Sequence, residues 1–357
     1  MKRLALCCDG TWNRADQHRA GVYCPTNVLK LALRIANRDP DGVSQVIFYD
    51  QGVGTRRGLD RLSGGAFGAG LEDNIYEAYR FLIANYEPGD EVFLFGFSRG
   101  AFTARSLAGL LRRCGLLRQD AMDEYVAARR LYRSIPSPEH PDAVRFRSRF
   151  AWCGAEAVRI RFVGVWDTVG SLGIPLHGLR GLTRQSYTFH DTELSGSVQE
   201  ACHALVIDER RPPFLPATWL HVPKPGQTVE QVWFPGVHGA VGGGYPETGL
   251  SDLTLDWMLA RAEAAGLALD GPMQAQHPLA PEPTGVRHES RRGPYRLLAG
   301  VDRQIGFSTD RGGVLRPDPT QTVHPSARSR WDADPGYRSP QLRAWHARAS
   351  DPRATEP

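Results

Sequence analysis

The chain has 357 residues, 41% of them hydrophobic, and a formal net charge of +4. That is enough for one large domain with a substantial core, or for two smaller ones. So small a net charge argues against nucleic acid as a partner, and the pairs Arg112-Arg113 and Arg291-Arg292 are explained by a solvated surface.

The chain carries no sequence signal for a membrane span, a secretory leader or a metal site. No apolar run approaches the ~18 residues of a transmembrane helix, and residues 1–8 are too short for a signal peptide. The six cysteines have neither zinc-site nor redox-pair spacing. We therefore expect a cytoplasmic protein, with signal-independent secretion as the alternative. We expect no cofactor, no metal and at most peripheral membrane contact. Nothing in the pattern predicts an oligomeric state.

Strands and helices alternate through the first half of the chain. This alternation is typical of an α/β fold with a mostly parallel, doubly wound sheet and helices on both faces. Apolar runs that end in turn residues predict strands at 3–8, 45–49 and 91–95, and helical spacing predicts helices at 27–36, 71–86 and 98–114.

The second half is less regular. Strands are predicted at 158–165 and 229–234, and helices at 198–205 and 253–264. Because there is no repeat and no clear linker, we expect a single α/β-hydrolase-like catalytic domain over residues 1–340. Residues 115–157 and 171–197 are the expected insertions and the candidates for a cap over the site. Residues 341–357 are expected to form a flexible tail.

One serine stands in a setting typical of a catalytic nucleophile. Gly96-Phe97-Ser98-Arg99-Gly100 follows the predicted strand 91–95 and opens a predicted helix. This strand–turn–helix arrangement is that of a nucleophile elbow, which exposes the serine oxygen at the end of a sheet. Without that setting the Gly-x-Ser-x-Gly pattern is weak evidence, and the alternative is a turn serine with a structural role.

A nucleophilic serine needs a base and an acid, which follow it in this fold in the order acid, then histidine. Asp167 follows the next predicted strand and His238 follows the last one, where open α/β sheets place functional groups. The structural alternatives are a helix cap for Asp167, with Asp252 as the substitute acid, and a loop histidine for His238.

An oxyanion hole needs two donors beside the serine. The first candidate is the amide of Arg99, which follows Ser98 at a helix amino terminus. The second is the amide of Thr11, in the loop Asp9-Gly10-Thr11-Trp12-Asn13 after the first strand. Equally, this loop can be an ordinary turn that Asp9 caps.

Several sequence blocks together resemble one known family. They are CDGTWN at 8–13, TNV at 26–28, YDQGVGT at 49–55, GFSRGA at 96–101, VWDTVG at 165–170, AL at 204–205 with DERR at 208–211, WFPGVH at 233–238 and HPS at 324–326. In this order they resemble the catalytic domain of the type VI secretion phospholipase effectors. The resemblance implies an α/β-hydrolase fold, hydrolysis of lipid or other carboxylic esters, and a triad of Ser98, Asp167 and His238.

One block departs from the family pattern. The family commonly has Ser-Asp before Gly-Gly-Gly-Tyr, where this chain has Gly239 and Ala240. The acyl chain length, the head group and the choice between a lipid and a soluble ester therefore stay open.

Two other classes of protein compete with a serine hydrolase. Asp9-Gly10-Thr11 after a strand is similar to the haloacid-dehalogenase phosphohydrolases, but Cys7 occupies the position of their nucleophilic aspartate. The other class is a non-catalytic relative that binds a ligand or partner through the same cleft. We expect a carboxylic ester hydrolase with Ser98 as nucleophile.

Overall fold

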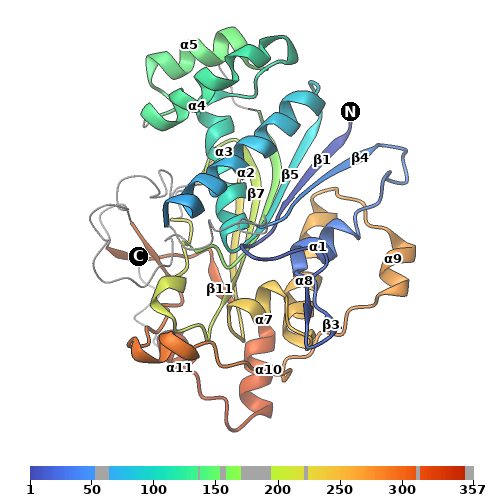
Figure 1. Cartoon of the computed structure of the whole chain (residues 1–357). Helices are drawn as coiled ribbons and strands as arrows, with labels where there is room; N and C mark the ends of the chain where they lie inside the picture. Colours follow the sequence, from blue (N-terminus) through green and yellow to red (C-terminus); the bar gives the residue numbers. More distant parts are fainter. Residues whose placement is uncertain are drawn as a thin grey trace.

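The fold is built on one parallel sheet. A computed structural model of the protein describes residues 1–52, 64–135, 137–152, 158–169, 194–220, 224–310 and 314–349. Seven strands lie in the order β11-β8-β7-β6-β5-β1-β4, and every neighbouring pair is parallel (Figure 1). The predicted α/β fold is thus confirmed. The strands are β1 (Arg3–Cys8), β4 (Gln45–Asp50), β5 (Glu91–Phe97), β6 (Ile160–Trp166), β7 (Val198–Val206), β8 (Thr228–Phe234) and β11 (Gln321–Val323).

Helices cover both faces of the sheet, because side chains alternate along the central strands and both faces are buried. Leu4 and Leu6 of β1 belong to one apolar core, and Ala5 and Cys7 to the other. The first core is covered by α2 (Gly64–Asn85) and α3 (Arg99–Cys114), and the second by α1 (Asn27–Ala32) and α8 (Gly249–Ala264) (Figure 1).

The remaining elements are short. They are β2 (His18–Arg19), β3 (Val22–Tyr23), η2 (Gln119–Glu124), α4 (Tyr125–Ser134), α5 (Pro141–Phe150), η3 (Pro212–Phe214), α7 (His238–Gly242), α9 (Gly271–Gln276), η4 (Gly293–Leu297), β9 (Phe307–Thr309), β10 (Leu315–Pro317), α10 (Pro325–Ala333) and α11 (Pro340–Ala349).

Two expectations about local structure are wrong. The segment predicted as a helix at 198–205 is strand β7, which lies between β6 and β8; a strand buried on both faces shows no period of two that distinguishes it from a helix. The expected flexible tail is helical up to Ala349, because Leu342 of α11 is buried with Trp233 and Tyr337. Residues 350–357 lie outside the described part.

The insertion expected at 115–157 contains α4 and α5, but these helices do not cap the serine. The Tyr132 hydroxyl donates to the Ser106 carbonyl at 3.1 Å, and Arg147 donates to the Arg113 carbonyl at 2.8 Å. These contacts are at the middle and the carboxyl-terminal end of α3, whereas Ser98 precedes its first residue (Figure 1). Most of the second candidate cap, 171–197, lies outside the described residues.

The strand order changes direction between β1 and β5. The chain adds β4 on one side of β1 and then β5 on the other, which makes this pair the topological switch point of the sheet. Open α/β sheets bind their ligands at such a point, beyond the carboxyl ends of the strands. Cys8 pairs with Gly96, so the loop after β1 lies next to Ser98.

Candidate active site

Ser98 has a strained backbone that its neighbouring glycines permit. Its φ of 57° and ψ of −117° lie outside the regions that side chains favour. A Cβ on Gly96 would lie 2.4 Å from the Gly100 carbonyl oxygen, and one on Gly100 would lie 2.0 Å from that of Cys8. Any larger residue at either position would therefore push the turn apart. This is the geometry of a nucleophile elbow.

The three residues predicted as a triad come together at the carboxyl edge of the sheet. Phe97 pairs with Trp166, so Ser98 and Asp167 leave adjacent strands side by side. The Ser98 Oγ lies 2.8 Å from Nε2 of His238, and Nδ1 of His238 lies 2.6 Å from Oδ2 of Asp167. The distances fit a serine hydroxyl that donates to Nε2 of the imidazole, whose Nδ1–H donates to the carboxylate.

Two aromatic rings pack against the imidazole of His238. The His238 ring centroid lies 4.7 Å from that of Phe97 and 4.9 Å from that of Phe214. His238, Ser98 and Asp167 are all buried. Among the described non-glycine residues, Trp12, Ala20, Ser98 and Asp167 have positive φ, so two members of the predicted triad have a strained backbone.

Arg303 is a part of the site that the sequence does not predict. Its guanidinium donates to Oδ1 of Asp167 at 2.6 Å and to Oδ2 at 3.1 Å, and it also donates to the Val206 and Phe214 carbonyls. Burial alone would raise the pKa of Asp167, but the charge of Arg303 and the bond from His238 outweigh it and hold this pKa well below its ordinary value. Arg303 lies in an irregular, arginine-rich region with no motif around it.

Loss of Arg303 should cost stability as well as order in the site. Arg303→Gln leaves the Asp167 carboxylate buried with fewer partners, so we expect the free energy of unfolding to fall by about 3 kcal/mol or more in urea denaturation. Arg328→Gln is the control, because Arg328 pairs with Asp332 at the surface and should cost less than about 1 kcal/mol. Equal losses in the two variants would contradict this role for Arg303.

Two acids next to β7, the buried Glu209 and the half-buried Asp208, hold the loop that carries His238. Glu209 accepts three bonds from Arg211 and one from the His238 amide at 3.4 Å. Asp208 accepts a hydrogen bond from the Gly236 amide at 2.7 Å and another from the Tyr337 hydroxyl. Burial raises the pKa of Asp208 to about 6 against these bonds. In the sequence, these two acids stand out only as part of the block DERR at 208–211.

Asp252 does not take the place of Asp167. Its Oδ1 lies 2.8 Å from the Lys30 ammonium, and its Oδ2 accepts the Thr248 hydroxyl and the Ala280 amide. These partners make Asp252 a link between α8, α1 and the segment after α9. The carboxylate that contacts His238 in this structure is that of Asp167 and not that of Asp252.

The loop after β1 is tied down by Asp9. Its buried carboxylate accepts bonds from the Gly10 amide at 2.6 Å, the Thr26 hydroxyl at 2.6 Å and the Tyr49 hydroxyl at 2.7 Å. The two interpretations of this loop, a turn capped by Asp9 and a source of an oxyanion donor, are therefore compatible, because the loop that Asp9 caps lies beside Ser98. That the amides of Thr11 and Arg99 bind an oxyanion stays a prediction.

The departure at Gly239 and Ala240 has a packing reason. Ala240 is 4% exposed, in an apolar cluster with Val237 and Leu250. A Cβ on Gly239 would lie 2.8 Å from the Tyr245 ring. An Asp at 240 would be buried among apolar groups, and a Ser at 239 would displace Tyr245.

Other surface features lie apart from the serine. Among the described residues, no group of three or more His, Cys, Asp or Glu side chains has metal-site spacing, and none of the helices is long and apolar enough to cross a membrane.

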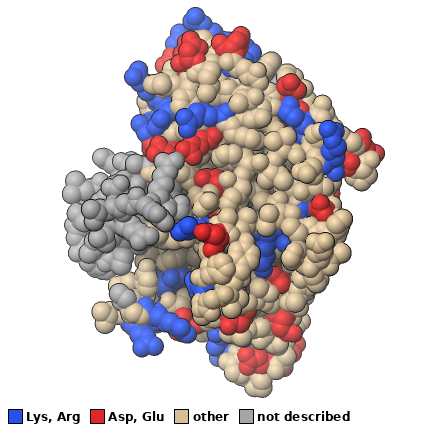
Figure 2. All heavy atoms as spheres, turned by 45° about the vertical axis from the view of Figure 1, so that its right-hand side comes forward, with Lys and Arg blue, Asp and Glu red and all other residues tan. Residues whose placement is uncertain are grey.

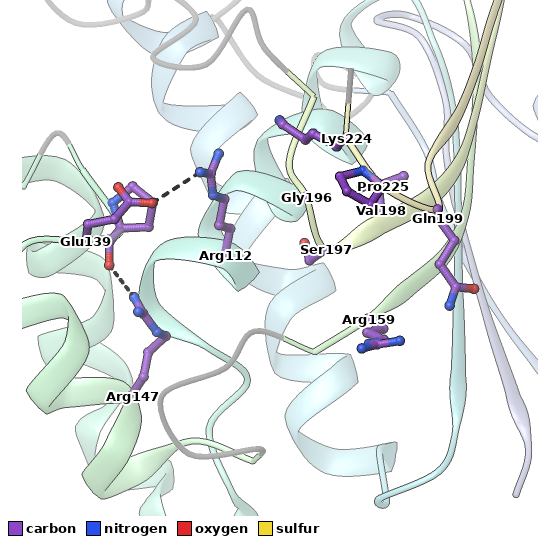
Figure 3. Close-up of a pocket in the computed structure, with 12 residues that line it drawn as sticks. Arg112, Glu139, Arg147, Arg159, Gly196, Ser197, Val198, Gln199, Lys224 and Pro225 are labelled. Atoms are coloured by element: carbon purple, nitrogen blue, oxygen red, sulfur yellow. Dashed lines mark hydrogen bonds and ion pairs between the residues drawn. The ribbon is translucent and has the colours of Figure 1, made fainter. Parts of the chain in front are cut away.

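A hollow of about 480 Å³ lies before the amino ends of β6, β7 and β8 and is lined by Arg112, Arg147, Arg159 and Lys224 (Figure 3). Basic and acidic side chains are interspersed on the face shown in Figure 2.

The fold and the site are those of an α/β protein with a serine, histidine and aspartate in one hydrogen-bonded row, an arrangement that serine hydrolases use. Residues 2–261 match the family described as "T6SS, Phospholipase effector Tle1-like, catalytic domain", and the chain belongs to this family.

Individual relatives are longer or more distant. The chain is 32% identical over 233 residues to the uncharacterized protein YEL023C of Saccharomyces cerevisiae, covering 60% of this chain and 32% of that protein. An uncharacterized protein from Pseudomonas aeruginosa is 21% identical with a TM-score of 0.46, covering 76% of this chain and 47% of that one. The Tle1 effector bound to the VgrG spike is 18% identical with a TM-score of 0.40, covering 69% and 51%. The chain thus spans about a third to a half of these proteins.

Proposed function

We propose that the protein is a serine hydrolase that cleaves carboxylic esters, with lipid or phospholipid acyl esters as its substrates, through Ser98, His238 and Asp167. The observation that carries the proposal is the unbroken hydrogen-bonded row from Ser98 Oγ to the Asp167 carboxylate at the switch point of the sheet. The family supports an ester in a lipid as the substrate class.

In the first half of the reaction, the Ser98 oxygen attacks the ester carbonyl carbon while Nε2 of His238 takes the hydroxyl proton. The amides of Arg99 and Thr11 stabilise the resulting oxyanion. When the tetrahedral intermediate collapses, the carbon–oxygen bond to the alcohol breaks and His238 returns the proton to that alcohol. An acyl group then remains on Ser98.

In the second half, water replaces the alcohol. His238 takes a proton from the water, whose oxygen attacks the acyl carbon, and then gives the proton back to Ser98 as the carboxylic acid leaves. The Asp167 carboxylate stabilises the imidazolium in both halves. Because Arg303 keeps Asp167 ionised, the acid can fulfil this role without becoming protonated.

A panel of esters tests the activity. p-Nitrophenyl esters from short to long acyl chains, together with phospholipid vesicles, should be hydrolysed, with the rate depending on chain length. We expect the same rates in EDTA, because this mechanism uses no cation. Complete, reversible loss of activity in EDTA would favour a metal-dependent mechanism or a structural ion, and no hydrolysis of any ester would favour a non-catalytic binding protein.

A further inference from the structure

Two 3-10 helices beside His238 each direct an aromatic ring toward the site and leave a leucine in solvent. Phe214 ends η3 against the His238 ring, and the next residue, Leu215, is 45% exposed. Tyr295 of η4 has its ring centroid 6.3 Å from that of Phe214, and Leu297, which ends η4, is 89% exposed. Both leucines are thus exposed on the helices whose rings pack beside His238.

The two helices are joined to each other and to the site by one arginine. The Arg211 guanidinium lies 3.5 Å from the Phe214 ring centroid and 5.4 Å from that of Tyr295. Such stacked contacts stabilise the pair of rings and fix η4 relative to η3. On the other side of Ser98, the loop after β1 carries Trp12, which is 42% exposed.

Exposed cations accompany the most exposed leucine. Arg292, at the start of η4, and Arg296, next to Leu297, are both exposed. Asp302, farther along the chain, is paired with Arg210. Exposed apolar side chains next to arginines are the combination that binds an anionic lipid surface: the apolar groups enter the interface, and the cations stay at the head groups.

We propose that this rim, defined as Trp12, Leu215, Leu297, Arg292 and Arg296, docks the mouth of the site onto anionic lipid. Ser98 is only 7% exposed, so a lipid ester has to leave the bilayer to reach it. A rim seated in the interface shortens that path. The inference rests on the proposed function, since it concerns how a lipid ester would reach the same serine.

Vesicle sedimentation of the full chain tests the rim. Vesicles of phosphatidylcholine with and without phosphatidylglycerol are compared for wild type, Leu297→Asp and Arg292→Gln/Arg296→Gln. We expect Leu297→Asp to weaken binding on the order of tenfold. The double arginine variant should lose the preference for phosphatidylglycerol, because each basic residue near an anionic surface contributes about fivefold.

A soluble ester and a matched control separate docking from chemistry. Val126→Asp makes the same kind of change in another exposed aliphatic residue, 52% exposed on α4, and should leave vesicle binding unchanged. Leu297→Asp should keep kcat/KM for a soluble p-nitrophenyl ester within about twofold while hydrolysis of vesicle lipid falls with the binding. Equal vesicle binding by wild type and Leu297→Asp, or an equal loss in Val126→Asp, would overturn the rim. A wild type that binds vesicles through Leu297 but cleaves no ester would instead overturn the proposed function alone.

Discussion

Ser98→Ala is expected to lower ester hydrolysis by a factor on the order of 10³ or more, because the substitution removes the atom that forms the acyl-enzyme. The Ser98 hydroxyl contacts His238, and its amide bonds the Trp166 carbonyl, a bond that alanine keeps. The turn and the helix after it should therefore persist. Initial rates on a p-nitrophenyl ester give the measurement.

Folding of the Ser98→Ala variant has to be shown beside its activity. Its far-UV circular dichroism spectrum and thermal midpoint should match those of the wild type, because one polar atom in a strained turn contributes little to stability. Rates comparable with wild type would end the assignment of Ser98. Loss of activity together with loss of the fold would have to be resolved by Ser98→Cys, which keeps a nucleophilic atom in place.

Asp167→Asn is expected to lower kcat by a factor of about 10³ to 10⁴. The amide can present an N–H to Nδ1 of His238, which stabilises the wrong tautomer, and it cannot support the positive charge that develops on the imidazole. It also leaves Arg303 without a full counter-charge. The comparison of kcat at saturating substrate with KM separates this effect from substrate binding.

Asp252→Asn is the matched control, since it makes the same chemical change in another buried acid. Loss of the carboxylate charge at position 252 weakens the bond to Lys30, but the bond between His238 and Asp167 is kept. We expect kcat within about twofold of wild type and a free energy of unfolding lower by about 2 kcal/mol. If Asp252→Asn lost as much kcat as Asp167→Asn, the choice of Asp167 as the acid would be wrong.

The meeting of the three central residues could be predicted because each one lies at or shortly after the end of its strand. Ser98 and Asp167 follow β5 and β6 directly, and His238 comes four residues after the end of β8. Each side chain is therefore delivered to the carboxyl edge of the sheet, wherever the intervening segments go. Because β5, β6 and β8 are parallel, local sequence patterns are enough to predict that these side chains meet. The prediction of β7 as a helix shows the limit of such patterns, since burial on both faces removes the strand period.

Arg303 could not be predicted for the opposite reason. It lies 136 residues from Asp167, and its role depends on how the chain after α9 returns to the carboxyl edge of the sheet. From the sequence alone, an arginine in a region rich in arginine is expected to be exposed to solvent. Its burial, at 2% exposure, and its two bonds to the Asp167 carboxylate become visible only in the folded chain. The family match ends at residue 261, so the matched part does not include this residue.

Labelling with a fluorophosphonate tests the identity of the nucleophile most directly. The reagent phosphonylates a serine only where a neighbouring base activates the oxygen. Digestion and mass spectrometry of the treated full chain should find one modified residue, Ser98, and no label in the Ser98→Ala variant. An unmodified wild type, or a label on another serine that persists in Ser98→Ala, would contradict the assignment of Ser98 as the nucleophile.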